Sequence, residues 1–266
     1  MKSIKGIGLN DVQIVYGGAE GDLWELIMGE QVHIGGFASS MDLSTKAGIG
    51  AGMTGVDFCC CNGAGMRFLL KFKGVKSMTG VDATEKVINQ GIERNKKLGL
   101  VDKTRFIKAD VISSGLPSGT FDFAWGEDAW CYVDDKAKLI SEAARVVKPG
   151  GIIAFTDWVE GPGLTDAEAG RYMKFMKFPN VLSIADYKAL LEKSGCVVKE
   201  ADNTGRFAPC VDLYLDMLNK QLTYDALKII GFDMNMMQGL GGEMVFMQGL
   251  AHAGKIAQGR FIAVKK

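Results

Sequence analysis

Two aspartates and a glycine-containing turn in the first half of the chain have the residue types and the spacing that a binding site for a nucleoside-containing molecule requires. Asp57 lies near the end of an apolar run, and the turn 61–65 that follows it contains two glycines. Asp82 comes 17 residues after Gly65, at the end of the next apolar run. A tight turn at a helix N-terminus offers unpaired backbone N–H groups to an anion. An acid at the end of the next strand accepts hydrogen bonds from a ribose diol.

The carboxylate of Asp57 distinguishes between two cofactors that contain a ribose. Sites for NAD favour G-x-G-x-x-G, because the glycines let the pyrophosphate approach the backbone. The segment 57–65, DFCCCNGAG, does not match this pattern. An acid at Asp57 would repel a pyrophosphate but would pair with an ammonium group, such as that of a methionine moiety. This argument favours S-adenosylmethionine, and a nicotinamide-dependent oxidoreductase is the alternative.

Further candidates follow the next two predicted strands. Asp110 can accept a hydrogen bond from an adenine amino group, while the N–H of Val111 donates one. The segment WGEDAWCY begins at Trp125, at the end of another strand. Ligands of α/β proteins bind at the carboxyl ends of parallel strands, so these aromatic and acidic residues are candidates for substrate binding. Simple packing of Trp125, Trp130 and Tyr132 is the alternative.

The elements that must position these residues alternate between strands and helices. We predict strands at 55–60, 77–81, 104–108, 121–125, 152–157, 196–201 and 260–265. We predict helices at 66–72, 85–98, 136–147, 171–178, 184–193, 211–230 and 234–256, and a short helix capped by Ser40. This alternation indicates βαβ units with right-handed crossovers, and therefore an α/β fold.

The bulk composition restricts the function further. With 31 basic and 31 acidic residues, the chain lacks the basic field that nucleic acid would require. It contains no apolar run of about 20 residues, so we expect no membrane span. The N-terminus has no signal-peptide pattern, and we expect it to be frayed or lightly docked. Six cysteines without a CxxC pair predict free thiols in the cytoplasm, and His33 and His252 are too isolated for a metal site.

Five segments in order resemble the successive motifs of class I S-adenosylmethionine-dependent methyltransferases over about residues 50–160: VDFCCCNGAG, GVDAT, KAD, FDFAWGEDAW and AARVVKPGGIIAFTDW. The flanks WELIMGEQVHIGGF and LAHAGKIAQGRFIAVKK are similar to those of sarcosine/dimethylglycine N-methyltransferases and tocopherol-type C-methyltransferases. The resemblance implies a Rossmann-like seven-stranded sheet, mostly parallel with an antiparallel last strand, and helical lid insertions.

The resemblance also implies how the chain is organised and what it does. A single domain would comprise an N-terminal arm and cap at 1–53, a cofactor-binding core at 54–160, and lid helices with the last two strands at 161–266. The expected activity is methyl transfer to a small molecule, first to an amine nitrogen of the sarcosine or dimethylglycine kind. Carbon or oxygen methylation of a hydrophobic or aromatic molecule is one alternative, and a non-catalytic binding protein is another. A homodimer is compatible with all three.

Site residues follow from the same motifs. The residues expected at S-adenosylmethionine are Asp57, Cys59, Cys61, Gly63, Asp82, Ala83, Asp110, Val111, Gly126 and Glu127. The residues expected at the acceptor are Asp128 and His33 as catalytic groups, with Trp24, Trp130 and Tyr132 as contacts. No metal is expected. Methyl transfer from a sulfonium needs positioning more than acid–base power, so hydrogen bonding is the alternative role for Asp128, Glu127 and His33.

Two features depart from these expectations or extend them. The family usually has Gly-x-Gly where this chain has Cys59-Cys60-Cys61, so either the backbone lies farther from the cofactor or the thiols enlarge the pocket floor. We interpret these cysteines as small buried apolar residues, with a chemical role for the thiols as the alternative. An acceptor with a carboxylate would need an arginine, for which Arg206 is the first candidate and Arg171 the second.

Overall fold

A seven-stranded sheet in the order β4-β3-β2-β5-β6-β9-β8 is the centre of the computed structural model, which describes residues 1–266. The strands are β2 (Thr54–Phe58), β3 (Ser77–Asp82), β4 (Thr104–Lys108), β5 (Phe121–Glu127), β6 (Val147–Glu160), β8 (Cys196–Asn203) and β9 (Ile256–Lys265). Neighbouring strands are parallel except where β9 pairs with β6 and β8. The predicted mixed sheet with an antiparallel last strand is confirmed.

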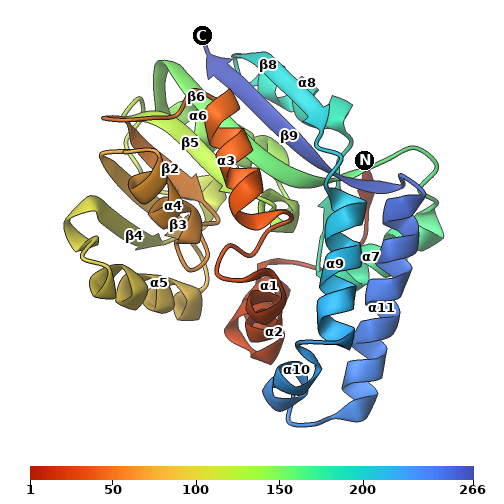
Figure 1. The fold of residues 1–266 in the computed structure, drawn as a ribbon. Coiled ribbons are helices and arrows are strands. Elements are labelled where there is room, and N and C mark those ends of the chain that lie inside the picture. The colour runs from red at the N-terminus through yellow and green to blue at the C-terminus, as the bar shows by residue number, and fades with distance from the viewer.

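Helices cover both faces of this sheet (Figure 1). One face packs against α3 (Gly36–Lys46) and α4 (Ala64–Phe72), with α5 (Glu85–Lys97) beside the edge strand β4. The other face packs against α6 (Lys136–Val146) and α8 (Ile184–Lys193). The central strands are buried on both faces, as continuous apolar runs in a parallel sheet require.

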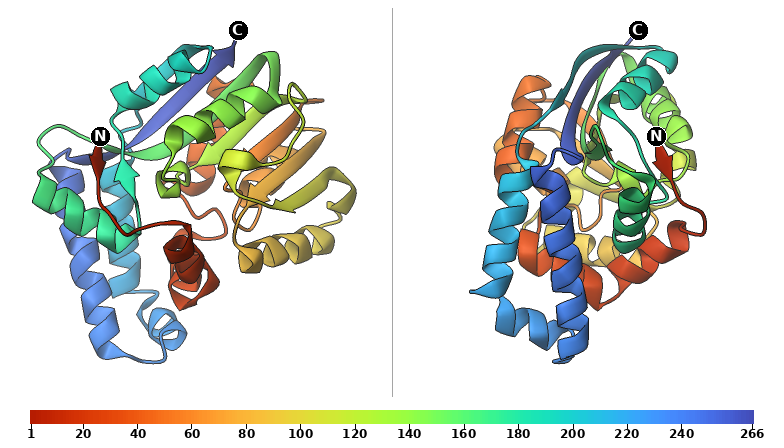
Figure 2. Two further views of the ribbon diagram at one scale, coloured as in Figure 1. Left: turned by 180° about the vertical axis from the view of Figure 1, so that it is seen from behind. Right: turned by 90° about the vertical axis from the view of Figure 1, so that its right-hand side faces the viewer.

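A second group of helices extends beyond one end of the sheet (Figures 1 and 2). We call this group the lid; it consists of α1 (Leu9–Gly17), α2 (Ala19–Met28), α7 (Asp166–Met176), α9 (Phe207–Asn219), α10 (Thr223–Ile229) and α11 (Met234–His252). Its helices pack around a core of 25 buried residues that also includes Trp158 of β6 and Ile256 of β9. None of the helices of this chain has the length and apolar character that crossing a membrane would require.

The N-terminus is docked, which is the second of the two arrangements that the sequence left open. Strand β1 (Lys2–Ser3) pairs with β7 (Asn180–Val181), and the terminal amino group lies 2.8 Å from a carboxylate oxygen of Glu160. The predicted helix 211–230 was also wrong, because the chain turns between α9 and α10. Ser40 is buried inside α3 and does not cap it; the N-cap position is Gly35, which has a φ of +84°.

Candidate functional site

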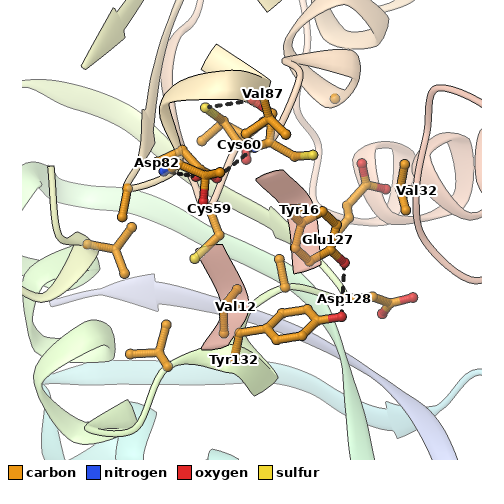
Figure 3. Close-up of a pocket in the computed structure, with 18 of the residues that line it drawn as sticks. Val12, Tyr16, Val32, Cys59, Cys60, Asp82, Val87, Glu127, Asp128 and Tyr132 are labelled. Carbon is orange, nitrogen blue, oxygen red and sulfur yellow. Dashed lines mark hydrogen bonds between the residues drawn. The ribbon is translucent and has the colours of Figure 1, made fainter. Parts of the chain in front are cut away.

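A cavity of about 430 Å³ opens at the carboxyl ends of β2, β3 and β5 (Figure 3). This volume lies within the range of sites for small molecules. The wall is formed by the turn after β2, the ends of β3 and β5, and the 3₁₀ turns η2 (Val111–Ser113) and η3 (Trp130–Tyr132). The cavity is covered by helix α1 and by residues 30–33, which belong to the loop between α2 and α3. The cavity therefore lies between the carboxyl ends of these strands and the N-terminal segment.

The turn after β2 has the positive φ values that are typical of glycine, although cysteines occupy these positions. Cys59 and Cys61 have φ values of +60° and +47°. This left-handed region costs a residue with a side chain about 1–2 kcal/mol. The N–H of Cys61 donates to the Asp82 carboxylate at 2.9 Å, which helps to hold the turn in place. The cysteine side chains thus line a cavity whose backbone would suit glycines, and Figure 3 shows Cys59 projecting into it.

The thiols of this turn are protonated at neutral pH. Burial, assisted by the nearby charge of Asp82, raises the pKa of Cys61 to about 12. Burial also raises the pKa of Cys59 and of Cys60 well above the usual value. A thiolate is the reactive form of cysteine. The structure therefore supports the interpretation that these residues are small apolar groups.

Asp57 is a buried carboxylate to which the protein offers no cation. Its exposed fraction is 4 %. Burial raises its pKa, and the negative charges of Glu127 and Asp82 raise it further. Gly65 keeps the space beside it open, since a Cβ there would lie 3.2 Å from a carboxylate oxygen of Asp57. Gly65, which the sequence placed in the turn, was not among the predicted cofactor-binding residues. Gly63, which was among them, has a φ of +75°, and a Cβ there would lie 2.6 Å from the Phe106 ring.

Two more carboxylates stand at the ends of their strands as predicted. Asp82 accepts hydrogen bonds from the N–H groups of Cys61 and Thr84, the latter at 2.8 Å. Asp110 accepts from the N–H of Ile112 at 3.1 Å and so caps η2. Each oxygen retains a further lone pair for a ligand. Ala83 and Val111 line the cavity beside them, and Gln13 of α1 donates to the Ala83 carbonyl at 2.8 Å.

His33, Ser40 and Glu127 form one hydrogen-bonded group at the cavity wall. The hydroxyl of Ser40 donates to Glu127 Oε1 at 2.7 Å, so its oxygen is left to accept. That oxygen accepts from the Gln31 amide at 2.8 Å and lies 3.2 Å from His33 Nε2. Nε2 therefore donates to this oxygen, which selects the tautomer with the proton on Nε2. Nδ1 of His33 is consequently a buried acceptor, and no protein group partners it.

Asp128 connects strand β9 with the loop that contains His33. Its Oδ2 accepts from the N–H of Ile34 at 2.8 Å and from the Gln258 amide at 2.8 Å. Its Oδ1 is buried without a partner. Burial raises the pKa of Asp128 to about 6, although the nearby imidazole of His33 opposes the rise. The predicted catalytic residues Asp128 and His33 thus lie together, and Asp128 also has a positioning role.

A pair of tyrosines connects the lid to the sheet at the cavity. The hydroxyls of Tyr16 and Tyr132 lie 2.9 Å apart, and their rings meet edge to face at 5.5 Å (Figure 3). Burial raises the pKa of both phenols, so both remain neutral. Tyr132 was predicted, whereas Tyr16 was missed, because no local pattern shows that α1 packs over the site.

Five predicted residues do not line this cavity, and Gly63, described above, is one of them. Trp130 is buried by stacking on Phe155 at 4.0 Å, and Gly126 is the space that its ring fills, since a Cβ there would lie 2.2 Å from its indole nitrogen. Trp24 packs inside the lid, beside a separate cavity.

Arg206 is the fifth predicted residue that does not line the cavity. Its guanidinium lies 2.6 Å from Asp42 on α3, because α9 begins beside that helix rather than at the mouth of the cavity. Arg171, the second candidate, pairs with Glu243 at 3.0 Å within the lid. Neither arginine is available to an acceptor in the cavity.

Comparison with known proteins finds a family match for the segment that contains these strand ends. Residues 56–155 match the family model described as a methyltransferase domain. The chain is 32 % identical over 117 residues to the sterol 24-C-methyltransferase of Eremothecium gossypii, which covers 44 % of this chain and 31 % of that protein. The chain spans about a third to a half of the length of the first curated relatives that it matches.

Solved structures share the fold over nearly the whole chain. The Haemonchus contortus phosphoethanolamine N-methyltransferase 2 in complex with S-adenosyl-L-methionine matches with a TM-score of 0.84 at 19 % identity, over 96 % of this chain and 59 % of that one. The [4+2]-cyclase SpnF matches with a TM-score of 0.80 at 16 % identity, over 98 % of this chain and 99 % of that one. At these identities the likeness describes the fold alone.

Proposed function

We propose, on the premise that this chain carries a class I S-adenosylmethionine-dependent methyltransferase domain, that it transfers the methyl group of this cofactor to a small molecule. One observation carries the proposal: the buried carboxylate of Asp57 has no cation beside it and borders the cavity. An ammonium group of a ligand would relieve this arrangement, because a buried charge without a partner is costly.

The residues around the cavity fit the parts of the cofactor. Asp57 would hold its ammonium group, Asp82 its ribose hydroxyls, and Asp110 with Val111 its adenine. Bound S-adenosylmethionine supplies an electrophilic methyl group on a sulfonium. Gly65 supports this fit, because its missing side chain leaves room beside Asp57. The six free cysteines support a reducing location such as the cytoplasm.

An amine nitrogen is the first candidate for the methylated atom. A protonated amine must lose a proton before it can act as a nucleophile, and the imidazole of His33, which lines the cavity, is the candidate base. Glu127 and Ser40 orient the ring through Nε2, as a general base requires. Asp128 holds the loop that carries His33. The Tyr16–Tyr132 pair closes the cavity and excludes water, which strengthens electrostatic interactions inside it.

Carbon or oxygen methylation of an apolar molecule is the second candidate. It is supported by the cavity wall, in which 16 of the 30 residues are hydrophobic. An acceptor of this kind would use the apolar wall for binding and would need His33 only for an acidic hydroxyl or carbon.

Two measurements test the proposal in sequence. Titration calorimetry with S-adenosylmethionine, S-adenosylhomocysteine and NAD should show binding of the first two and not of NAD. Incubation with methyl-labelled cofactor and a metabolite extract, followed by mass spectrometry, should then show a product heavier by one labelled methyl group. Failure to bind S-adenosylmethionine, or binding of NAD in its place, would refute the proposal. Binding without turnover over a broad panel would instead support a non-catalytic binding protein.

A further inference from the structure

A second cavity lies inside the lid, apart from the cavity at the strand ends. Its volume is about 230 Å³, and its wall comes from α2, α7, α9 and α11. Figures 1 and 2 show α9 and α11 side by side, and α2 packs against α9. No residue lines both cavities. The cofactor that we propose for the larger cavity therefore does not explain the cavity in the lid.

The lid cavity interrupts a packed apolar core. Nine of the 13 residues that line it are hydrophobic, and Leu23, Ile27 and Met244 among them belong to the buried core of the lid. Protein interiors contain few voids larger than a water molecule. A void removes packing contacts from the side chains around it, and an apolar void offers few partners to water. A ligand with an apolar surface would restore the lost contacts.

Gly241 of α11 leaves part of this space free at a cost to its own helix. Glycine in a helix interior is less stable than alanine. A Cβ at Gly241 would meet no atom within 4 Å, so close packing does not require a glycine there. Met244 also lines the cavity, and its flexible side chain, of a type that fills irregular gaps, leaves the space open. Helix α11 thus keeps room that a larger residue at position 241 would occupy.

Aromatic rings and one carboxylate give the wall of the lid cavity its chemical character. The rings of Trp24 and Phe175 meet edge to face with their centroids 6.3 Å apart, and both residues line the cavity. A flat aromatic ring packs well against such a wall. Glu20 is the one charged residue of the wall, and burial raises its pKa against the opposing influence of Lys177 and of the Trp24 indole. A carboxyl group in a largely apolar wall favours a ligand that donates a hydrogen bond to it.

We propose that the lid cavity binds a neutral aromatic molecule of one or two fused rings, with one N–H or O–H group that donates to Glu20. The volume fits this class, because an apolar cavity of roughly 150 Å³ in a protein accepts benzene. Asn219 and Gln238 are exposed residues of the wall, so the cavity has an opening to solvent on the side of α9 and α11. A charged molecule would lose its hydration against the apolar wall. This site is independent of the methyl transfer proposed above.

Indole and benzofuran test this proposal, because their rings have nearly the same shape and only indole has an N–H group. Titration calorimetry should show that indole binds with a Kd of roughly 1 mM or lower. Benzofuran should bind about three- to tenfold more weakly, since a lost hydrogen bond changes an affinity by this order. Indole should also raise the Tm, because a ligand that binds only the folded state stabilises it.

Two neighbouring glycines of α11 supply matched variants that locate the binding. Gly241→Leu fills the cavity and should weaken indole binding about tenfold or more, because overpacking an occupied cavity is costly. Gly242→Leu makes the same change at an exposed residue that does not line the cavity, and the affinity should stay unchanged. A Cβ at either position has open space, so both variants should fold. Gly241→Ala adds less volume and should have an intermediate affinity.

The results distinguish the lid cavity from other places where indole could bind. Absence of indole binding to the wild-type protein would overturn the proposal. Equal affinities of Gly241→Leu and Gly242→Leu would also overturn it, because indole would then occupy the larger cavity or the surface. If benzofuran binds as tightly as indole, Glu20 does not select a donor, and the proposed class of ligand is wrong. Binding that prefers indole and is weakened only by the substitutions at Gly241 would support the proposal.

Discussion

Replacing Asp128 by asparagine should stabilise the folded protein at neutral pH. The carboxylate is 5 % exposed, and burial raises its pKa from 3.8 to about 6. One pKa unit corresponds to about 1.4 kcal/mol, so this rise from 3.8 to about 6 amounts to a cost of roughly 3 kcal/mol at pH 7. Asparagine has the same shape, and its oxygen can still accept from Ile34 and Gln258. We therefore expect the free energy of unfolding at pH 7 to increase by about 1–3 kcal/mol.

The pH dependence of this gain identifies its cause. Because the pKa of Asp128 is higher in the folded state, the stability of the wild-type protein falls as the pH rises from about 4 to about 6. Below this window the side chain is protonated in both states, and no electrostatic cost remains. The advantage of Asp128→Asn should therefore disappear near pH 4 and reach its full size above pH 6.

Urea unfolding of both proteins at a series of pH values between 4 and 8 would measure this difference. Asp135→Asn is a matched control of opposite sign, because hydrogen bonds from the N–H and the side chain of Lys138 lower the pKa of Asp135. That variant should be less stable than the wild type at pH 7, and the loss should shrink toward low pH. A variant Asp128→Asn that is no more stable at pH 7, or whose gain persists at pH 4, would refute the reasoning.

Three further predictions concern Asp57 and the buried cysteines. Asp57→Asn should weaken binding of S-adenosylhomocysteine about 10- to 100-fold, because a hydrogen bond to a charged group contributes about 1.5–3 kcal/mol. Titration calorimetry measures this affinity, with Asp166→Asn as the control. An unchanged affinity would contradict the assignment of Asp57 to the ammonium group. Cys59→Gly should be more stable than Cys59→Ala by about 0.5–1 kcal/mol, because only glycine is unstrained at a positive φ; chemical denaturation of the two variants decides the order. Iodoacetamide at pH 7.5 should label Cys60 and Cys131 slowly, since burial raises the pKa of both thiols; mass spectrometry that finds rapid labelling of Cys131 in the folded protein would disagree.

The strands and the cofactor carboxylates could be predicted from the sequence because their signals are local. Apolar runs marked each strand of the sheet to within a few residues, and β4 was predicted at 104–108 as observed. Asp57, Asp82 and Asp110 lie at or just beyond the ends of separate strands, and parallel strands bring their carboxyl ends to one edge of the sheet. Their convergence at one cavity follows from that topology without knowledge of any long-range contact.

The acceptor side could not be predicted in the same way, because it is assembled from segments far apart in the chain. Tyr16 reaches the cavity only because α1 packs over Tyr132, 116 residues later. Asp128 is held by Gln258, 130 residues later. The sequence placed Trp130 and Arg206 near strand or helix ends, but tertiary packing turned both away from the cavity.

The cysteine turn shows the same division between local signal and tertiary structure. The residue types alone show that two residues with side chains, Cys59 and Cys61, stand where glycines would be expected. It could not determine whether the backbone would adapt to them. Tertiary contacts decided this: Asp82, on the neighbouring strand, accepts from the N–H of Cys61, and the turn keeps positive φ values at both cysteines. Contacts from the neighbouring strand outweigh the local preference of an L-residue, because its strain of about 1–2 kcal/mol is small beside the packing of the sheet.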